Sequence, residues 1–221
     1  MTKNQTTRGG HVPTGTSAER RARTAGSVTE KGERTRRLII DSARAVFEEK
    51  GYLDVRVSDI VRRAGVAHGS FYTYFPSKLE VFQAIVNIVG EEIDQAVQRT
   101  SGESPGDWRQ NLLNANYRYL EVYQRNHKIY ILIEQTATLD EQVKAYRLAG
   151  RRRHLDRVES SLRHLQERGI ASPELDIPLT AAALVTMLSS LAMWIHIEGK
   201  EIDLRTVAET VTDIWTKSIV R

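Results

Sequence analysis

After residue 32, hydrophobic residues recur at helical spacing along almost the whole chain. Ile40, Ala43 and Phe47, for example, lie three and four positions apart and therefore share one face of a helix. Gly51 and Pro76 stand where two such patterns end, which is typical of the residues that follow helices. No run alternates hydrophobic and polar residues as a half-buried strand does, and no Asn-Gly hairpin turn occurs. The pattern predicts an all-α chain.

The same spacing, together with capping residues, gives the positions of the helices. Ser77 and Glu80 form an S-x-x-E capping box at the start of one helix, and Asp203 is suited to cap the last helix. In chain order, the predicted segments are a helix ending at Lys50, Val57–Ala64, His68–Phe75, Ser77 to about Arg99, a helix from Trp108 with a break or kink at residues 125–127, a short buried helix Ile129–Thr136, Asp140–Arg168, Ile177 to near Gly199, and a helix after Asp203.

Charge is distributed unevenly along the 221 residues. Residues 1–75 contain 14 Lys and Arg against 8 Asp and Glu, a net charge of +6, whereas residues 76–221 contain 18 against 20, a net charge of −2. A basic front joined to a near-neutral body indicates that the front binds a polyanion. Residues 1–32 lack apolar periodicity and bury too little surface to order themselves, so we expect a disordered basic arm. Composition leaves open whether this arm is an inert tail or touches DNA.

Several function classes are excluded or disfavoured by composition. The absence of cysteine excludes a disulfide scaffold, a thiolate zinc site, an iron–sulfur cluster and a cysteine nucleophile. No histidine pair has metal-ligand spacing with an acidic third ligand nearby, and no Ser–His–Asp spacing, phosphate loop or dinucleotide turn occurs. We therefore expect no metal, no cofactor and no enzymatic activity.

One segment, Ile177–Ile197, carries no formal charge and is long enough to span a bilayer. It contains polar residues such as Ser189 and His196, however, and lacks the flanking Lys and Arg clusters that orient a membrane span. A helix that is hydrophobic all round is equally well explained by burial within a protein or an oligomer interface. The N-terminus also lacks the apolar region of a secretory signal. A cytoplasmic protein without membrane contact is expected.

The segment Val57–Phe75 has the organisation of a helix-turn-helix. Gly65 permits a tight turn between two short helices, and Ile60 and Phe71 contribute to the small core where they cross. The second helix of such a motif enters the major groove of DNA, while neighbouring hydroxyls and cations contact phosphates. We expect His68, Ser70 and Thr73 to influence sequence preference, and Tyr74 and Lys78 to bind phosphate. The predicted DNA contacts are Arg56, Ser58, His68, Gly69, Ser70, Tyr72, Thr73, Tyr74 and Lys78.

One continuous run resembles the signature of the tetracycline-repressor (TetR) family of transcriptional regulators. The run is Gly65-Val66-Ala67-His68-Gly69-Ser70-Phe71-Tyr72-Thr73-Tyr74-Phe75-Pro76-Ser77-Lys78, and Ala43-x-x-x-Phe47-x-x-x-Gly51-Tyr52 and Asp59-Ile60-Val61 fit the same pattern. The resemblance covers about residues 34–82 and implies a homodimer that binds a near-palindromic operator. It also implies release of the operator when a small molecule occupies the C-terminal domain. The sequence departs from the family pattern at three positions. Arg56 stands where Thr is usual, Val61 where a small residue is frequent, and Ala67 where Ser or Thr usually caps the recognition helix.

The chain is expected to divide into an arm (1–32), a helix-turn-helix DNA-binding domain (33–78) and a regulatory domain for ligand binding and dimerisation (79–221). The regulatory helices supply large rings that cannot all pack on one another, and few charges are expected to point inward. These features predict a cavity for a small, largely apolar effector. Its predicted lining is Trp108, Tyr119, Tyr123, Tyr130, Gln135, Met187 and Trp194.

The last two helices carry more apolar surface than one bundle needs to cover, which predicts pairing of two subunits about a two-fold axis. The run Arg151-Arg152-Arg153 is expected to form a solvated face rather than a site for an anionic ligand. The predicted interface residues are Leu184, Leu188, Leu191, Leu204, Val211, Ile214 and Trp215.

Two functions compete at this point. The first is a ligand-responsive, dimeric repressor whose partners are double-stranded DNA, a small effector and a second copy of itself. The alternative is a helical enzyme or membrane-attached protein that carries an incidental helix-turn-helix. Salt separates them, because only a protein that contacts phosphates loses affinity for DNA steeply as salt rises.

Overall fold

The computed structural model describes residues 17–98, 107–199 and 201–220, and within these ranges every regular element is an α-helix. The expectation of an all-α chain is confirmed. An isolated β-bridge pairs Ala171 with Val220. The helices are α1 (Ser17–Lys50), α2 (Val57–Ala64), α3 (His68–Tyr74), α4 (Lys78–Gln98), α5 (Trp108–Ala137), α6 (Glu141–Glu167), α7 (Ile177–Ile197) and α8 (Leu204–Ile219).

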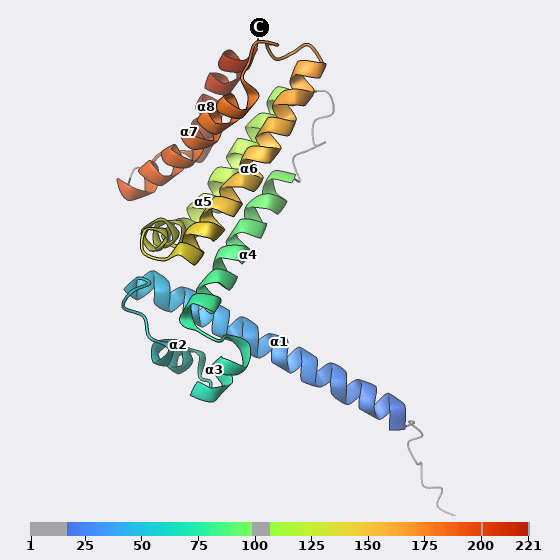
Figure 1. The fold of residues 1–221 in the computed structure, drawn as a ribbon, viewed down its shortest axis with the longest axis vertical. Helices are drawn as coiled ribbons and strands as arrows, with labels where there is room; N and C mark the ends of the chain where they lie inside the picture. Colours follow the sequence, from blue (N-terminus) through green and yellow to red (C-terminus); the bar gives the residue numbers. More distant parts are fainter. Residues whose placement is uncertain (1–16, 99–106, 200, 221) are drawn as a thin grey trace, which may run out of the picture.

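The helices form two unequal parts joined along one long axis. Helices α1–α3 lie at one end, and α4 leads from them into a bundle made with α5–α8 (Figure 1). Helix α5 packs against α4, α6, α7 and α8. The first half of α1 projects away from the rest of the molecule (Figure 1). Helices α2 and α3 therefore lie at the end away from the bundle, and α1 and α4 connect them to it.

A first hydrophobic core holds the smaller part together and extends beyond it. Phe47 of α1, Phe71 of α3 and Phe82 of α4 are fully buried at its centre. The same cluster also includes Ile129 of α5 and Val143 of α6. Since these last two residues belong to the bundle, the first core crosses the expected domain boundary at residue 78.

A second core fills the bundle. It combines Leu120 of α5, Leu162 of α6, Leu188 of α7 and Trp215 of α8, all buried. Tyr130 of α5 packs against both cores. The two parts of the molecule are thus in continuous side-chain contact through α5.

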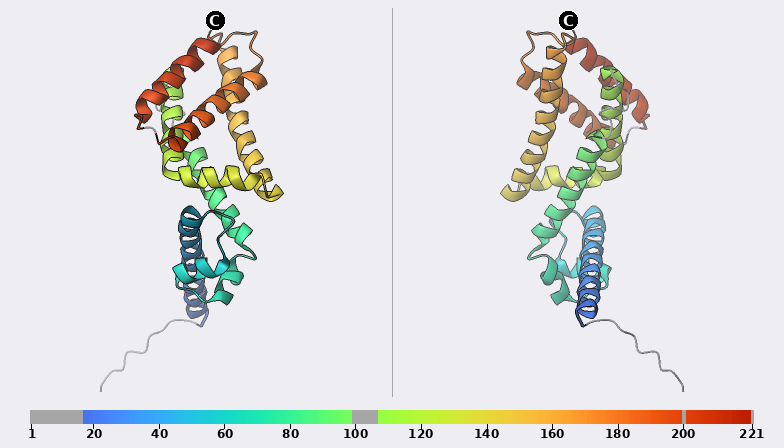
Figure 2. Two further views of the ribbon diagram at one scale, coloured as in Figure 1. Left: turned by 90° about the vertical axis from the view of Figure 1, so that its left-hand side faces the viewer. Right: turned by 90° about the vertical axis from the view of Figure 1, so that its right-hand side faces the viewer.

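Two boundaries differ from the sequence prediction. Helix α1 begins at Ser17, so residues 17–32 are helical rather than part of a disordered arm; residues 1–16 lie outside the described residues. Extending a helix costs much less than nucleating one, and the packed half of α1 provides the nucleus. The break or kink predicted at residues 125–127 does not end the helix, and the predicted short helix at Ile129–Thr136 is the second half of α5. Figure 2 shows that the two halves of α5 run in different directions.

A buried polar junction ties α1, α4 and α5 together. The side-chain oxygen of Asn126 on α5 accepts a hydrogen bond from Nη2 of Arg44 on α1 at 2.8 Å. Its amide nitrogen donates to Glu92 Oε2 on α4 at 2.9 Å and to the Val122 carbonyl at 2.9 Å. Asn126 is only 2% exposed, so each of these bonds replaces hydration that the side chain has lost.

We expect Asn126→Leu to lower the free energy of unfolding by about 2–4 kcal/mol, because Arg44 and Glu92 would each lose a buried partner. Urea denaturation of the full chain measures this loss. Gln124→Leu changes an exposed residue of the same helix in the same way and should shift the value by less than about 0.5 kcal/mol. Equal effects of the two substitutions would contradict a structural role for the junction.

Candidate DNA-binding surface and effector cavity

Helices α2 and α3 are joined by a turn that only glycine accommodates easily. Gly65 adopts φ +65° and ends α2, and the Val66 N–H bonds the Val61 carbonyl at 3.2 Å. A Cβ atom at Gly65 would meet nothing within 4 Å. The requirement for glycine therefore comes from the left-handed backbone and not from crowding.

The start of α2 is capped without the hydroxyl residue that is usual there. The carboxylate of Asp59 accepts from the Arg56 backbone N–H at 3.1 Å and pairs with Lys50 Nζ at 2.9 Å and with Arg62. The hydrogen bond from Lys50, with that from the Arg56 N–H, lowers the pKa of Asp59. The side chains of Arg56 and Ser58 remain exposed beside this cap, as expected for residues that contact DNA.

Helix α3 separates its buried residues from its exposed ones. Phe71 is fully buried, whereas His68, Gly69, Tyr72 and Thr73 are exposed. The rings of His68 and Tyr72 lie 5.4 Å apart on the exposed side. This face is available to a partner.

Two other predicted DNA contacts on α3 are less accessible. Ser70 and Tyr74 are half-buried, and the ring of Tyr74 packs against the first core. The Tyr74 hydroxyl lies beside α1, since a Cβ atom at Gly32 would be 3.7 Å from it. The structure therefore turns Tyr74 toward the protein, which a count of helical positions does not reveal.

Lys78 has a different role from the predicted phosphate contact. Its ammonium donates to the carbonyls of Tyr52, Leu53 and Val55 at 2.8, 3.3 and 2.9 Å, and it lies 4.6 Å from the centre of the Tyr52 ring. Burial lowers the pKa of Lys78. All three ammonium donors are satisfied within the protein, so Lys78 secures the loop between α1 and α2.

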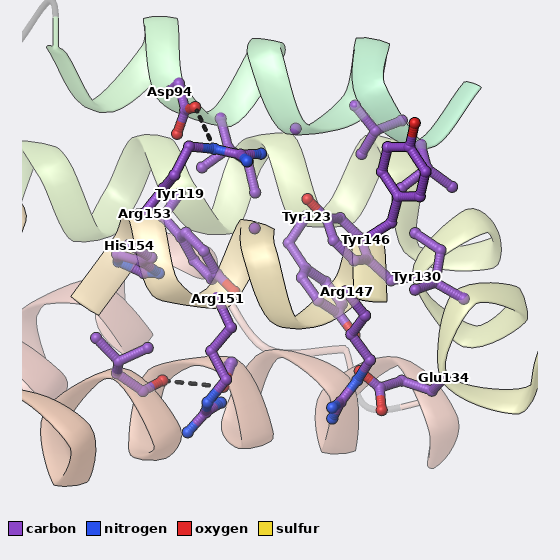
Figure 3. Close-up of a pocket in the computed structure, with 18 of the residues that line it drawn as sticks. Asp94, Tyr119, Tyr123, Tyr130, Glu134, Tyr146, Arg147, Arg151, Arg153 and His154 are labelled. Atoms are coloured by element: carbon purple, nitrogen blue, oxygen red, sulfur yellow. Dashed lines mark hydrogen bonds and ion pairs between the residues drawn. The ribbon is translucent and has the colours of Figure 1, made fainter. Parts of the chain in front are cut away.

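A cavity of about 440 Å³ opens between α4, α5, α6 and α7 (Figure 3). Three of the seven predicted lining residues, Tyr119, Tyr123 and Tyr130, lie in its wall. The rings of Tyr123 and Tyr130 are stacked, with centroids 4.4 Å apart. Burial raises the pKa of all three tyrosines, that of Tyr123 to about 12, so their hydroxyls stay protonated and serve as neutral hydrogen-bonding groups.

A second cavity of about 530 Å³ adjoins the first, and Tyr119, His154 and Arg157 line both. Trp108, another predicted residue, lines only this second cavity, whose wall is otherwise rich in Leu and Val. The remaining predictions are wrong for this structure: Gln135, Met187 and Trp194 line neither cavity, and Trp194 is 41% exposed. Trp194 points away from the core because its neighbour Ile195 takes the inward position on α7.

Charged residues are the part of the cavity wall that sequence analysis missed. Arg151 and the exposed Arg153 line the cavity, whereas Arg152, which is also exposed, does not line it and pairs with Asp156 and Glu159. The arginine run is therefore not simply a solvated face. Asp94 of α4 pairs with Arg153 and Arg157 across the helix interface. Neither helix alone indicates these pairs, because they join residues of α4 and α6 that are distant in sequence. The other residues of the wall that were not predicted are Val86, Asn87, Val89, Gly90, Ile93, Ile133, Glu134, Tyr146, Arg147, Gly150, His154, Val185, Thr186, Ser189, Ser190 and Met193.

His154 is neutral at physiological pH. Burial, reinforced by the positive charge of Arg157, lowers its pKa to about 4. Its ring lies 5.3 Å from that of Tyr119. The boundary between the two cavities thus consists of a neutral imidazole, a neutral phenol and a guanidinium.

The smaller part of the molecule matches a known group of regulators. The pattern of bacterial regulatory proteins of the tetR family fits residues 39–85, from the second half of α1 through α2 and α3 into α4. In these residues the chain is similar to the transcriptional regulators of the tetR family. The resemblance inferred from the helix-turn-helix residues is confirmed.

Relatives extend the similarity to the bundle. The A-factor receptor protein of Streptomyces griseus is 26% identical over 184 residues, which are 82% of this chain and 61% of that protein, so this chain spans about three fifths of its length. The fatty acid degradation regulator FadR from Bacillus halodurans has a similar fold, with a TM-score of 0.72 and 22% identity over 82% of this chain and 94% of that one. SmeT, the repressor of the Stenotrophomonas maltophilia multidrug efflux pump SmeDEF, gives a TM-score of 0.68 and 26% identity over 84% and 90%. TetR-family members are regulators, so the alternative of an enzyme is not supported.

Helices α7 and α8 present apolar side chains that the subunit does not cover. By length and composition alone, α7 is long and apolar enough to cross a membrane. Of its 18-residue apolar segment, only 28% is buried in the subunit. Both helices lie on the same side of the bundle (Figure 2). The large exposed side chains on them are Leu179, Trp194 and Ile197 of α7 and Ile214 of α8.

This exposed set differs from the predicted interface. Of the seven residues expected there, only Ile214 is exposed, at 48%, and Leu191 and Leu204 are half-buried. The other four belong to the second core of the subunit and are unavailable to a partner: Leu184, Leu188, Val211 and Trp215.

The pKa of His154 predicts a pH-dependent stability. Because the folded chain resists protonating His154 while the unfolded chain accepts a proton near pH 6.5, stability is lost as pH falls from about 6.5 toward 4. Between pH 7 and pH 5 we expect the wild type to lose about 2 kcal/mol more than His154→Gln, measured by urea denaturation. The exposed His164, changed to Gln, is the control and should behave like the wild type. Identical pH profiles for His154→Gln and the wild type would contradict the assignment.

Proposed function

We propose that this chain is a homodimeric transcriptional repressor that binds a near-palindromic operator and releases it when a small molecule occupies the bundle cavity. The observation that carries the proposal is the exposed face of α3 at one end of the molecule, where His68, Tyr72 and Thr73 face outward and Phe71 is anchored in the first core. Such a helix fits the major groove, where its N-terminal side chains meet base edges. DNA binding and a cytoplasmic location follow together from this proposal.

Effector binding is supported by the position of the cavity. Its walls include α4, which begins directly after the helix-turn-helix, and the segment of α5 whose Tyr130 packs against both cores. A ligand that favours one arrangement of α4 and α5 would thereby change the position of α3, whereas a ligand indifferent to the two arrangements would change nothing. The solved complex of the relative SmeT with triclosan, at 24% identity and a TM-score of 0.71, is consistent with a small-molecule effector.

Dimerisation is supported by the uncovered apolar faces of α7 and α8. Two-fold pairing of these faces would cover them and would place two α3 helices on one side of the dimer. For such a dimer to bind one face of DNA, the recognition helices must lie about 34–36 Å apart, which is one helical turn. The operator is then expected to contain two half-sites related by the same symmetry.

His68→Ala is expected to weaken binding to the operator by about 1–3 kcal/mol while leaving non-specific binding unchanged, because an α3 side chain near the helix start contacts bases. Fluorescence anisotropy on DNA from upstream of the gene, over a series of salt concentrations, measures both affinities. The wild type should show a steep salt dependence. His164→Ala, at an exposed histidine on α6, is the matched control. An affinity of the wild type that does not depend on salt would argue against DNA as the partner.

Trp194→Glu combined with Ile214→Glu is expected to produce a folded monomer with poor operator binding, because two charges would enter the apolar interface. Analytical ultracentrifugation at micromolar concentration measures the association state. Leu148→Glu changes a half-exposed residue on α6 and should leave the dimer intact. A wild type that sediments as a monomer would refute the proposed dimer.

A further inference from the structure

We propose that the effector is an amphipathic organic monoanion, an apolar body bearing one acid group, and that Arg151 binds the acid group. This inference rests on the proposed function for its regulatory meaning, but its binding test does not involve DNA. It replaces the sequence-based expectation of a largely apolar effector with a molecule that has one defined charge.

The cavity between α4 and α7 carries excess positive charge. Four guanidinium groups line it, and only two carboxylates, Asp94 and Glu134, lie in the same wall. The imidazole of His154 adds no charge at neutral pH. An anionic guest is favoured by this imbalance, and a cationic guest is disfavoured.

The ion pairs of the wall leave one arginine without an acidic partner. Arg147 Nε lies 2.6 Å from Glu134, Arg157 Nη2 lies 2.8 Å from Asp94, and Arg153 lies 3.5 Å from the same carboxylate. Nη2 of Arg151 instead donates to the hydroxyl oxygen of Thr186 at 2.6 Å (Figure 3). Within the described part of the chain, Arg151 therefore holds a positive charge that no carboxylate neutralises.

Thr186 fixes the direction of this guanidinium. Its hydroxyl donates to the Ala182 carbonyl at 2.6 Å, so its oxygen is turned to accept from Arg151. Arginine has five N–H donors in a rigid fork, and one bond to Thr186 leaves others for a carboxylate or a similar planar acid group. Ser189 and Ser190, in the same wall of α7, are further polar groups near that end of the cavity.

The remaining wall suits the apolar body of the guest. Tyr119, Tyr123 and Tyr130 present aromatic rings on the α5 side, and the neighbouring cavity beyond Tyr119 adds apolar side chains such as Leu162, Leu188 and Trp215. At the passage between the cavities, Nε of Arg157 is buried without a hydrogen-bond partner, so this guanidinium also has unused donor capacity. A second acid group, however, would have to share a guanidinium with Asp94 or Glu134, whose negative charge would repel it. The wall therefore favours one charge and not several.

Three probes with the same ring system and different charge test the inference: 2-naphthoate, 2-naphthylmethanol and 2-naphthylmethylamine. Calorimetric titration of the full chain should give the tightest binding for the acid, at least about tenfold over the alcohol, and the weakest for the amine. Arg151→Met should weaken the acid by about 10–100-fold and leave the alcohol nearly unchanged, and Arg151→Lys should restore part of the preference.

Arg152→Met is the matched control, because it removes the same charge from the next residue of α6, which is exposed and does not line the cavity. It should retain the preference for the acid. Equal binding of acid and alcohol by the wild type, equal losses in the two variants, or no binding of any probe would each overturn the inference. If the protein binds acid and alcohol equally well and either one releases operator DNA, only the inference is overturned. If the protein prefers the acid but binds no operator, only the proposed function is overturned.

Discussion

The second half of α5 packs across α1 and α4, and the arrangement of the whole molecule depends on this contact. Ile129, Leu132 and Ile133 enter the core that also holds the helix-turn-helix. Asn126, one turn earlier, bonds Arg44 of α1 and Glu92 of α4. Apolar packing and directional hydrogen bonds therefore act at the same place, so α1 and α4 cannot move relative to α5 without breaking both.

This contact gives the proposed regulation a physical route. Tyr130 lies in the same stretch of α5, lines the cavity, and touches both cores. The neighbouring Tyr123 stacks on it, and Asp94 of α4 is bound to two arginines of α6. The residues that line the cavity and the core residues that hold α3 thus form one packed network. A movement of side chains in the cavity therefore has few ways to relax locally without also moving α3.

Sequence reasoning identified the elements whose local signals agree. Gly65, Phe71 and Pro76 mark the turn, the core contact and the end of the motif, and each is set by its own neighbourhood. Sequence reasoning failed where one side chain can bind either of two different groups equally well. The ammonium of Lys78 can satisfy carbonyls as well as phosphates, and only the fold brings the 52–55 loop to it.

The prediction of which α7 residues face the cavity failed for a related reason. This helix is apolar on every side, so periodicity cannot distinguish the face that meets the core from the face that remains uncovered, and Trp194 was assigned to the wrong one. The arginine run on α6 raised the same difficulty, because consecutive residues point in different directions and only the tertiary structure shows which of them meets the cavity. Contacts between helices distant in sequence carried the missing information.

The uncovered surface of α7 and α8 makes the proposed repression depend on the concentration of the subunit in the cell. If two subunits must meet before either binds an operator half-site tightly, occupancy of the operator grows with about the square of the subunit concentration while dimers are scarce. The folded subunit would also gain stability from its partner by mass action, so chains made at low copy number would be the more easily unfolded and degraded. The uncovered surface of α7 and α8 would then make repression respond to the subunit concentration as well as to an effector.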